Sequence, residues 1–179
     1  GSLQRVLRKG LKHIGFDKIE SMESVLVLGV AGGSVIKTLV DEIEYKGKIT
    51  GVEIDKDMID MANQYFGLHQ IPNLKIIIED AFEFVLRTHH RYDLIIIDIF
   101  QDTTMPNFLF EEFFIKKVGG LLNKNGYILF NTMILNQAQN DRNEQYCIHF
   151  RKHGYHAQKL PRIEHHNELV IIQNKKEDK

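Results

Sequence analysis

The stretch SVLVLGVAGGSVIKTLV, residues 24–40, decides the fold of this chain. It opens with a short apolar run, passes through a glycine-rich turn and continues at helical spacing to about residue 44. A continuous apolar run of this length is typical of a strand that is buried on both faces of a parallel sheet. The stretch therefore predicts a strand over residues 24–29 and a helix over residues 32–44, with the turn at the carboxyl end of the strand.

The same alternation of apolar runs and amphipathic stretches continues to residue 131. It predicts further strands over residues 48–54, 74–78, 92–100 and 127–133, and further helices over residues 55–66, 80–88 and 108–118. The pair Gly119-Gly120 and the turn residues 123–126 should end the last of these helices. Strands that alternate with helices in this way are typical of a parallel sheet with crossover helices.

The carboxyl-terminal part follows another pattern. A polar helix is expected over residues 137–152, and two strands over residues 155–160 and 168–173. Because the loop between these strands is too short for a right-handed crossover, they should be antiparallel neighbours. The predicted fold class is α/β: a Rossmann-like three-layer sandwich with a mostly parallel seven-stranded sheet and a C-terminal antiparallel hairpin. We expect this domain to span residues 24–174, after an amphipathic helix and linker over residues 1–23 and before a tail over residues 175–179.

The composition is that of an ordinary globular protein. Of 179 residues, 43% are hydrophobic and 26% are charged, and 23 Lys and Arg nearly balance 24 Asp and Glu. So small a net charge gives no overall attraction for nucleic acid or an anionic membrane, and no apolar run reaches the ~20 residues that span a bilayer. A lone cysteine, Cys147, favours a reducing, cytoplasmic location. We expect neither a nucleic-acid nor a membrane partner.

The turn after the first strand is a candidate ligand site, because ligands of open α/β sheets bind at the carboxyl ends of the strands near the topological switch. It consists of Gly29, Val30, Ala31, Gly32 and Gly33. Glycines let the backbone approach a ligand without a Cβ clash. The dinucleotide pattern would need glycines in place of Ala31 and Ser34, and the Gly-Lys-Ser/Thr of a phosphate loop is absent. Both nucleotide-phosphate interpretations are therefore disfavoured.

Acidic residues follow the next three strands. Glu53 can accept hydrogen bonds from both hydroxyls of a ribose. Asp80 and the small Ala81 suit an adenine, while Asp80 is also a good helix N-cap, and one residue can do both. Asp98 lies where a transferred group would emerge, so we expect it to orient a substrate amine or take its proton. The histidine pairs show no ligand spacing with cysteine or glutamate, so no metal is expected.

Five runs together carry a resemblance to a known family. They are VLVLGVAGGSVIKTLV, GVEIDKDMIDMANQYFG, NLKIIIEDAFEFV, YDLIIIDIF and FLFEEFFIKKVGGLLNKNGYILFN. In order, spacing and residue types they look like the spermidine synthase-like branch of the class I S-adenosylmethionine-dependent superfamily, over roughly residues 24–131. The resemblance implies an adenosyl-sulfonium site, with residues 29–33 against the amino-acid tail. It places Glu53 on the ribose with Ile54 beside it, Asp80 and Ala81 at the adenine, and Asp98 and Phe100 near the sulfonium.

The departures from the family pattern bear on the reaction. Aminopropyltransferases of this family carry an aspartate in the glycine loop that holds the amine of the decarboxylated cofactor, and this chain has Gly32 there. Of the two acids in their motif after the fourth strand, only Asp98 is retained, with Gln101 at the second place. We therefore expect in-line methyl transfer from S-adenosyl-L-methionine to a small molecule or a protein, and the resemblance suggests a homodimer. Two alternatives stay open: aminopropyl transfer to a polyamine from decarboxylated S-adenosylmethionine, and a non-catalytic cofactor-binding or interaction module.

Overall fold

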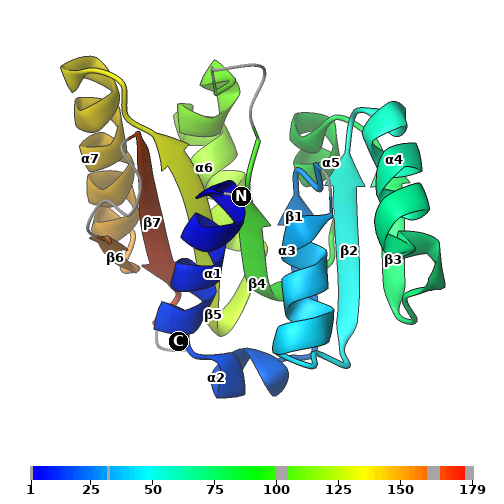
Figure 1. Cartoon of the computed structure of the whole chain (residues 1–179). Coiled ribbons are helices and arrows are strands. Elements are labelled where there is room, and N and C mark those ends of the chain that lie inside the picture. The colour runs from blue at the N-terminus through cyan, green and yellow to red at the C-terminus, as the bar shows by residue number, and fades with distance from the viewer. Residues whose placement is uncertain (1, 32, 100–104, 161–165, 176–179) are drawn as a thin grey trace.

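The computed structural model of the chain describes residues 2–31, 33–99, 105–160 and 166–175 (Figure 1). The strands are β1 (Ser24–Leu28), β2 (Lys48–Glu53), β3 (Leu74–Ile78), β4 (Tyr92–Ile97), β5 (Leu122–Met133), β6 (His156–Lys159) and β7 (Asn167–Gln173). They form one sheet in the order β3-β2-β1-β4-β5-β7-β6. The pairs from β3 to β5 are parallel, while β7 runs antiparallel to both β5 and β6. The predicted mostly parallel, seven-stranded sheet with its antiparallel hairpin is confirmed.

Helices cover both faces of the sheet (Figure 1). They are α1 (Ser2–Ile14), α2 (Phe16–Glu20), α3 (Ser34–Lys37), α4 (Lys56–Phe66), α5 (Ala81–Arg87), α6 (Glu112–Gly120) and α7 (Gln137–Lys152). Successive strand residues point to opposite faces, so Val25 and Val27 join one apolar cluster and Leu26 and Leu28 join the other. The first cluster takes in buried residues of α1 to α4, and the second takes in those of α5 to α7. Two apolar cores, one on each face, therefore give the expected three layers.

The helix α1 packs its apolar stripe onto the sheet. Val6, Leu7, Leu11 and Ile14 are buried in the same cluster as residues of β5 and β7. Its basic face carries Arg8, whose Nε lies 2.7 Å from a carboxylate oxygen of Glu42. The amino-terminal segment thus belongs to the packed layers of the domain.

One strand and two helices differ from their predicted extents. The strand predicted over residues 127–133 is β5, which begins at Leu122, so the residues predicted as a turn, 123–126, lie within it. The helix after β1 is α3 followed by the π-helical turn η1 (Thr38–Glu42), in which the backbone N of Ile43 donates to the carbonyl of Thr38. The helix predicted over residues 108–118 is the 3-10 turn η3 (Asn107–Phe110) and then α6, which continues through Gly119-Gly120. The helix ends at Gly120, the second residue of the predicted pair. A Cβ on Gly119 would lie 3.0 Å from the hydroxyl of Tyr155, so this glycine permits close packing.

Candidate active site

The order of the strands puts the topological switch at β1, where the chain leaves toward β2 on one side and β4 lies on the other. The turn after β1 meets β4 closely at this point. Gly29 has a φ of +90°, and a Cβ on it would lie 2.2 Å from the carbonyl oxygen of Asp98. Because that neighbour is backbone, no side-chain movement could relieve the contact. Gly29 is therefore needed for the first turn to lie against the end of β4.

Glu53 fixes the glycine turn from the side of β2. Its Oε1 accepts a hydrogen bond from the backbone N of Ala31 at 2.8 Å, and its Oε2 accepts one from Asp55 at 3.1 Å. A carboxylate offers about four acceptor positions, so two protein donors leave positions for other hydroxyl groups. The predicted ribose contact stays a prediction, and the structure adds a second task, because Glu53 shapes the turn itself.

Asp98 is held by a neighbour on β5. The side-chain amide of Asn131 donates to its Oδ1 at 3.1 Å, and the Oδ1 of Asn131 in turn accepts from the amide of Asn167 at 3.2 Å. Burial raises the pKa of Asp98 to about 6; the Asn131 hydrogen bond lowers it, and the negative charge of Glu53 raises it. This carboxyl group therefore changes its charge near neutral pH. A pKa so displaced at the end of a strand is a common feature of functional acids.

Asp80 is the N-cap of α5, as predicted. Its Oδ1 accepts from the backbone N of Phe82 at 2.8 Å and of Glu83 at 3.3 Å. The end of β3 is joined to that of β2, since the backbone N of Glu79 donates to the carbonyl of Glu53 at 3.1 Å. Asp80 and the buried Ala81 therefore follow the same edge of the sheet as Glu53. Their predicted contact with an adenine remains a prediction.

The predicted site residues differ in which of their atoms a ligand could contact. Gly29, Ala31, Glu53 and Asp98 are brought together by the contacts above. Val30 is buried, with its side chain toward Gly51 of β2, so only its backbone could meet a ligand. Ile54 is 59% exposed, which leaves an apolar surface at the edge for a planar ring. Gly32 and Phe100 lie outside the described residues.

Two site residues were missed by sequence reasoning. Asn131 is fully buried within an apolar strand, and Asn167 stands at the beginning of β7. A buried polar side chain needs a partner, so the asparagine in the run YILFNTM was the signal available for the first of them. The second depends on the register of β5 with β7, which the sequence does not reveal.

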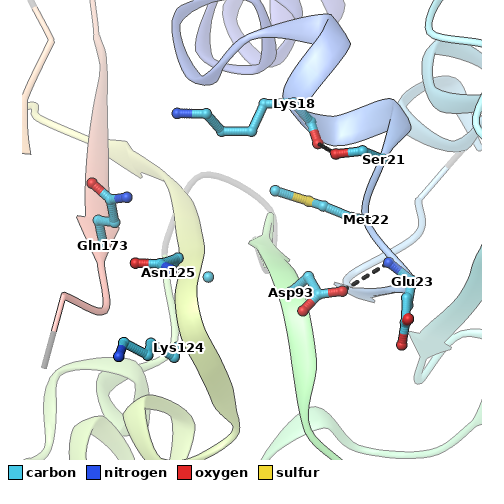
Figure 2. A pocket seen from close by; sticks show the side chains of 9 residues that line it. Lys18, Ser21, Met22, Glu23, Asp93, Lys124, Asn125 and Gln173 are labelled. Carbon is cyan, nitrogen blue, oxygen red and sulfur yellow. Dashed lines mark hydrogen bonds between the residues drawn. The ribbon is translucent and has the colours of Figure 1, made fainter. Parts of the chain in front are cut away.

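A separate hollow of about 540 Å³ lies at the opposite edge of the sheet, where β1, β4 and β5 begin (Figure 2). Its lining includes Lys18, Asp93 and Asn125. Asp93 accepts hydrogen bonds from the backbone N of Glu23 at 2.8 Å and Ser24 at 3.3 Å, and from the amide of Asn123 at 2.9 Å. The carboxylate is thus occupied in tying the entry of β1 to β4 and β5, which is a structural task.

The described residues hold no group of three or more His, Cys, Asp or Glu side chains arranged to bind a metal ion. Within the same residues, no helix has both the length and the apolar character needed to cross a membrane.

Comparison with known proteins gives matches of two kinds. The family model described as "Spermine/spermidine synthase domain" matches residues 5–165. A polyamine aminopropyltransferase of Buchnera aphidicola subsp. Schizaphis graminum is 30% identical over 141 residues, which make up 76% of this chain and 49% of that protein. An eEF1A lysine and N-terminal methyltransferase of Bos taurus is 31% identical over 124 residues, 63% of this chain and 18% of that protein. The chain therefore spans less than half the length of these relatives.

Among solved structures, human methyltransferase-like protein 13 in complex with SAH has a TM-score of 0.80 at 22% identity. The match covers 97% of this chain and 82% of that one. At this level of identity the likeness shows a shared fold.

Proposed function

This chain belongs to the spermine/spermidine synthase domain family, and from that premise we propose that it binds S-adenosyl-L-methionine and transfers its methyl group to an amine. When bound, the cofactor supplies an electrophilic methyl group on a positively charged sulfur. The residues of the site suit such a ligand. The remaining acceptor positions of Glu53 suit the hydroxyl groups of a ribose, and the exposed Ile54 offers an apolar surface to a planar ring.

The observation that carries this proposal is the composition of the glycine turn. Residues 29–33 contain no acidic residue. An acid in the turn would hold the amine of a decarboxylated cofactor and repel the carboxylate of the complete one. A turn of glycines and apolar residues instead leaves the carboxylate unopposed. This favours S-adenosylmethionine over its decarboxylated form, and with it methyl transfer over aminopropyl transfer.

An amine acceptor follows from the names of both curated relatives, one acting on polyamines and the other on lysine and the amino terminus. Asp98 would attract the ammonium form and orient its nitrogen. Because an ammonium nitrogen has no free electron pair, one of its protons would first pass to ionised Asp98 or to water, and the neutral amine would then be able to displace the thioether, with the electron pair of the carbon–sulfur bond staying on sulfur. Most of the acceleration would come from alignment of donor and acceptor. The acceptor can be a small molecule or a protein.

Aminopropyl transfer is the second candidate, and the family match together with the polyamine aminopropyltransferase relative favours it. It would use the same site, with Asp98 orienting a polyamine nitrogen. The two candidates differ in the cofactor that they require, so cofactor preference separates them.

The test is calorimetric titration of the purified chain with S-adenosylmethionine and, separately, with its decarboxylated form. We expect tighter binding of S-adenosylmethionine. The Glu53→Gln variant should bind it at least about tenfold more weakly, since a hydrogen bond to a charged group contributes about 1.5–3 kcal/mol. Asp57→Asn is the control, because it removes one negative charge from an exposed position close by in the first turn of α4.

Two outcomes of the titration would contradict methyl transfer. A preference for the decarboxylated form would replace methyl by aminopropyl transfer. No binding of either form by a folded chain would reject both and leave the non-catalytic module.

A further inference from the structure

Asp98, Asn131 and Asn167 form a chain of hydrogen bonds across three strands. Asn131 of β5 donates to Asp98 at the end of β4, and Asn167 of β7 donates to Asn131. The register of β5 with β7 pairs Asn131 with Leu169 and Met133 with Asn167. Asn167 is therefore the diagonal neighbour of Asn131 on the same face of an antiparallel pair, within reach of its side chain. The sheet itself holds the three residues in line.

The direction of the second hydrogen bond decides what Asn131 presents to Asp98. An asparagine amide has a donor end and an acceptor end, and a half-turn of the side chain exchanges them. Asn167 donates to the Oδ1 of Asn131, so this oxygen is directed toward β7 and the NH2 group toward Asp98. A reversed Asn131 would put its oxygen against the carboxylate and would favour a protonated Asp98, which could donate to it. By donating to the Oδ1 of Asn131, Asn167 supports the orientation that suits the ionised acid.

Asn131 is fully buried, so it cannot itself serve the acceptor. Its neighbour Thr132 is held separately, with its hydroxyl donating to the carbonyl of Glu168 at 2.7 Å. Among the described residues, Glu53 is the charged group that acts on Asp98, and its negative charge disfavours the ionised form. Burial and the charge of Glu53 raise the pKa of Asp98, and the hydrogen bond from Asn131 lowers it. Without this hydrogen bond, little in the described part of the site would keep Asp98 ionised.

We propose that Asn131 and Asn167 are positioning residues that keep Asp98 ionised and aimed at the acceptor amine, with Asn167 acting through the orientation of Asn131. The role in methyl transfer to an amine rests on the function proposed above. The control of the Asp98 charge does not depend on it, because it concerns the protein alone.

The direct test is a pH titration of the Asp98 carboxyl carbon by NMR in the wild type and in two single variants, Asn131→Ala and Asn167→Ala. We expect the proton dissociation constant of Asp98 to fall about tenfold in Asn131→Ala, since a hydrogen bond to a charged group contributes about 1.5–3 kcal/mol and 1.4 kcal/mol corresponds to a factor of ten. Asn167→Ala leaves Asn131 in place but free to reverse. Its effect should have the same sign and be smaller.

The matched control is Asn123→Ala. Asn123 donates to Asp93 at 2.9 Å, an equivalent asparagine–aspartate pair at the other edge of the sheet, so its loss should leave the titration of Asp98 unchanged. Thermal unfolding of each variant reports whether it is folded, and Asn167 at the half-buried start of β7 is the milder substitution should Asn131→Ala unfold.

An unchanged Asp98 titration in folded Asn131→Ala, or in folded Asn167→Ala if the first variant unfolds, would overturn the proposal. If the titration shifts as expected and the chain transfers no methyl group, the proposed function fails while the control of Asp98 stands. If both hold, the pH at which transfer is half-maximal should rise in the same order as the Asp98 pKa.

Discussion

Asp98 links the charge of the site to the stability of the protein. Because its pKa is raised to about 6 in the folded chain, the folded state holds a proton between about pH 4 and pH 6 that the unfolded chain has already released. Stability should therefore fall as the pH rises through this window, by at most about 3 kcal/mol, and remain level above it. Asp98→Asn cannot ionise, so it should lack this part of the decline. Urea unfolding of both proteins across the window measures the difference.

The control for this comparison is Asp57→Asn, an exposed carboxylate whose removal should leave the pH slope of the wild type intact. Identical slopes in wild type and Asp98→Asn would show that Asp98 titrates normally and would remove the basis for its role as a proton acceptor. Above about pH 6 the ionised form prevails, so methyl transfer should increase through the same window in which stability declines.

The sequence predicted which edge of the sheet the acidic residues of the site occupy, because parallel strands end at one edge and their last residues must meet there, while their contacts with a ligand stay predictions. Glu53, Asp80 and Asp98 all follow this rule. The sequence did not predict that Glu53 accepts a hydrogen bond from the glycine turn. The bond comes from the backbone N of Ala31 at a φ of +48°, a conformation that is uncommon for residues other than glycine. Nor did it predict the pairing of Asp98 with Asn131 and Asn167. This pairing depends on the register of β5 with β7, and α7 and β6 lie between these two strands in the sequence.

At the scale of the element, α1 is held by a close approach to the sheet. A Cβ on Gly10 would lie 2.6 Å from a methyl carbon of Leu129 and 3.0 Å from one of Leu169. A large side chain there would force α1 off β5 and β7. Gly10→Leu should lower the free energy of unfolding by about 1–3 kcal/mol, the usual effect of overpacking a core. Chemical denaturation followed by circular dichroism measures this change.

Lys9→Leu provides the comparison, since it adds an equally large apolar residue at the adjoining exposed position of α1. Its effect should stay within about 0.5 kcal/mol, as for most surface substitutions. Equal stabilities of the two variants would mean that α1 is not packed against β5 and β7 as described. It would also remove α1 as a cover for the face on which Asn131 lies.

Elements with a single strong signal were predicted closely. The strand β3 and the helix α7 have the predicted bounds, because turn residues or caps mark their ends. The prediction was incomplete where a residue's role depends on its tertiary contacts. The pair Gly119-Gly120 lies at the end of α6 as predicted, but the sequence did not indicate that Gly119 also lets Tyr155 and Phe150 approach the helix. The helix predicted after β1 continues from α3 into the π-helical turn at Thr38–Glu42, which the apolar spacing does not indicate. Such choices depend on tertiary contacts that a local pattern does not contain.

Over the whole molecule, the two edges of the sheet carry different tasks. At the carboxyl edge the polar groups converge on a turn with glycines and an exposed apolar residue, and Glu53 and Asp98 retain acceptor capacity. At the amino edge Asp93 uses both of its oxygens to fix the beginning of β1 and the start of β5. Both edges are polar and the hollow of Figure 2 is roomy, so polarity and size alone would not distinguish them. The carboxylates do, because Asp93 accepts three hydrogen bonds from the protein, Glu53 two and Asp98 one among the bonds described.

This division predicts where cofactor binding slows hydrogen exchange. The amides of Ala31 and Asp55 both donate to Glu53, whereas those of Glu23 and Ser24 donate to Asp93. At a concentration of S-adenosylmethionine one hundred times its Kd, openings that release the ligand become less frequent by about a hundredfold, which corresponds to about 2.7 kcal/mol. The first pair of amides should slow by up to this factor. The second pair should change only as far as their exchange requires global unfolding. Slowing confined to Glu23 and Ser24 would instead place the ligand at the amino edge, and the carboxyl-edge site would have to be abandoned.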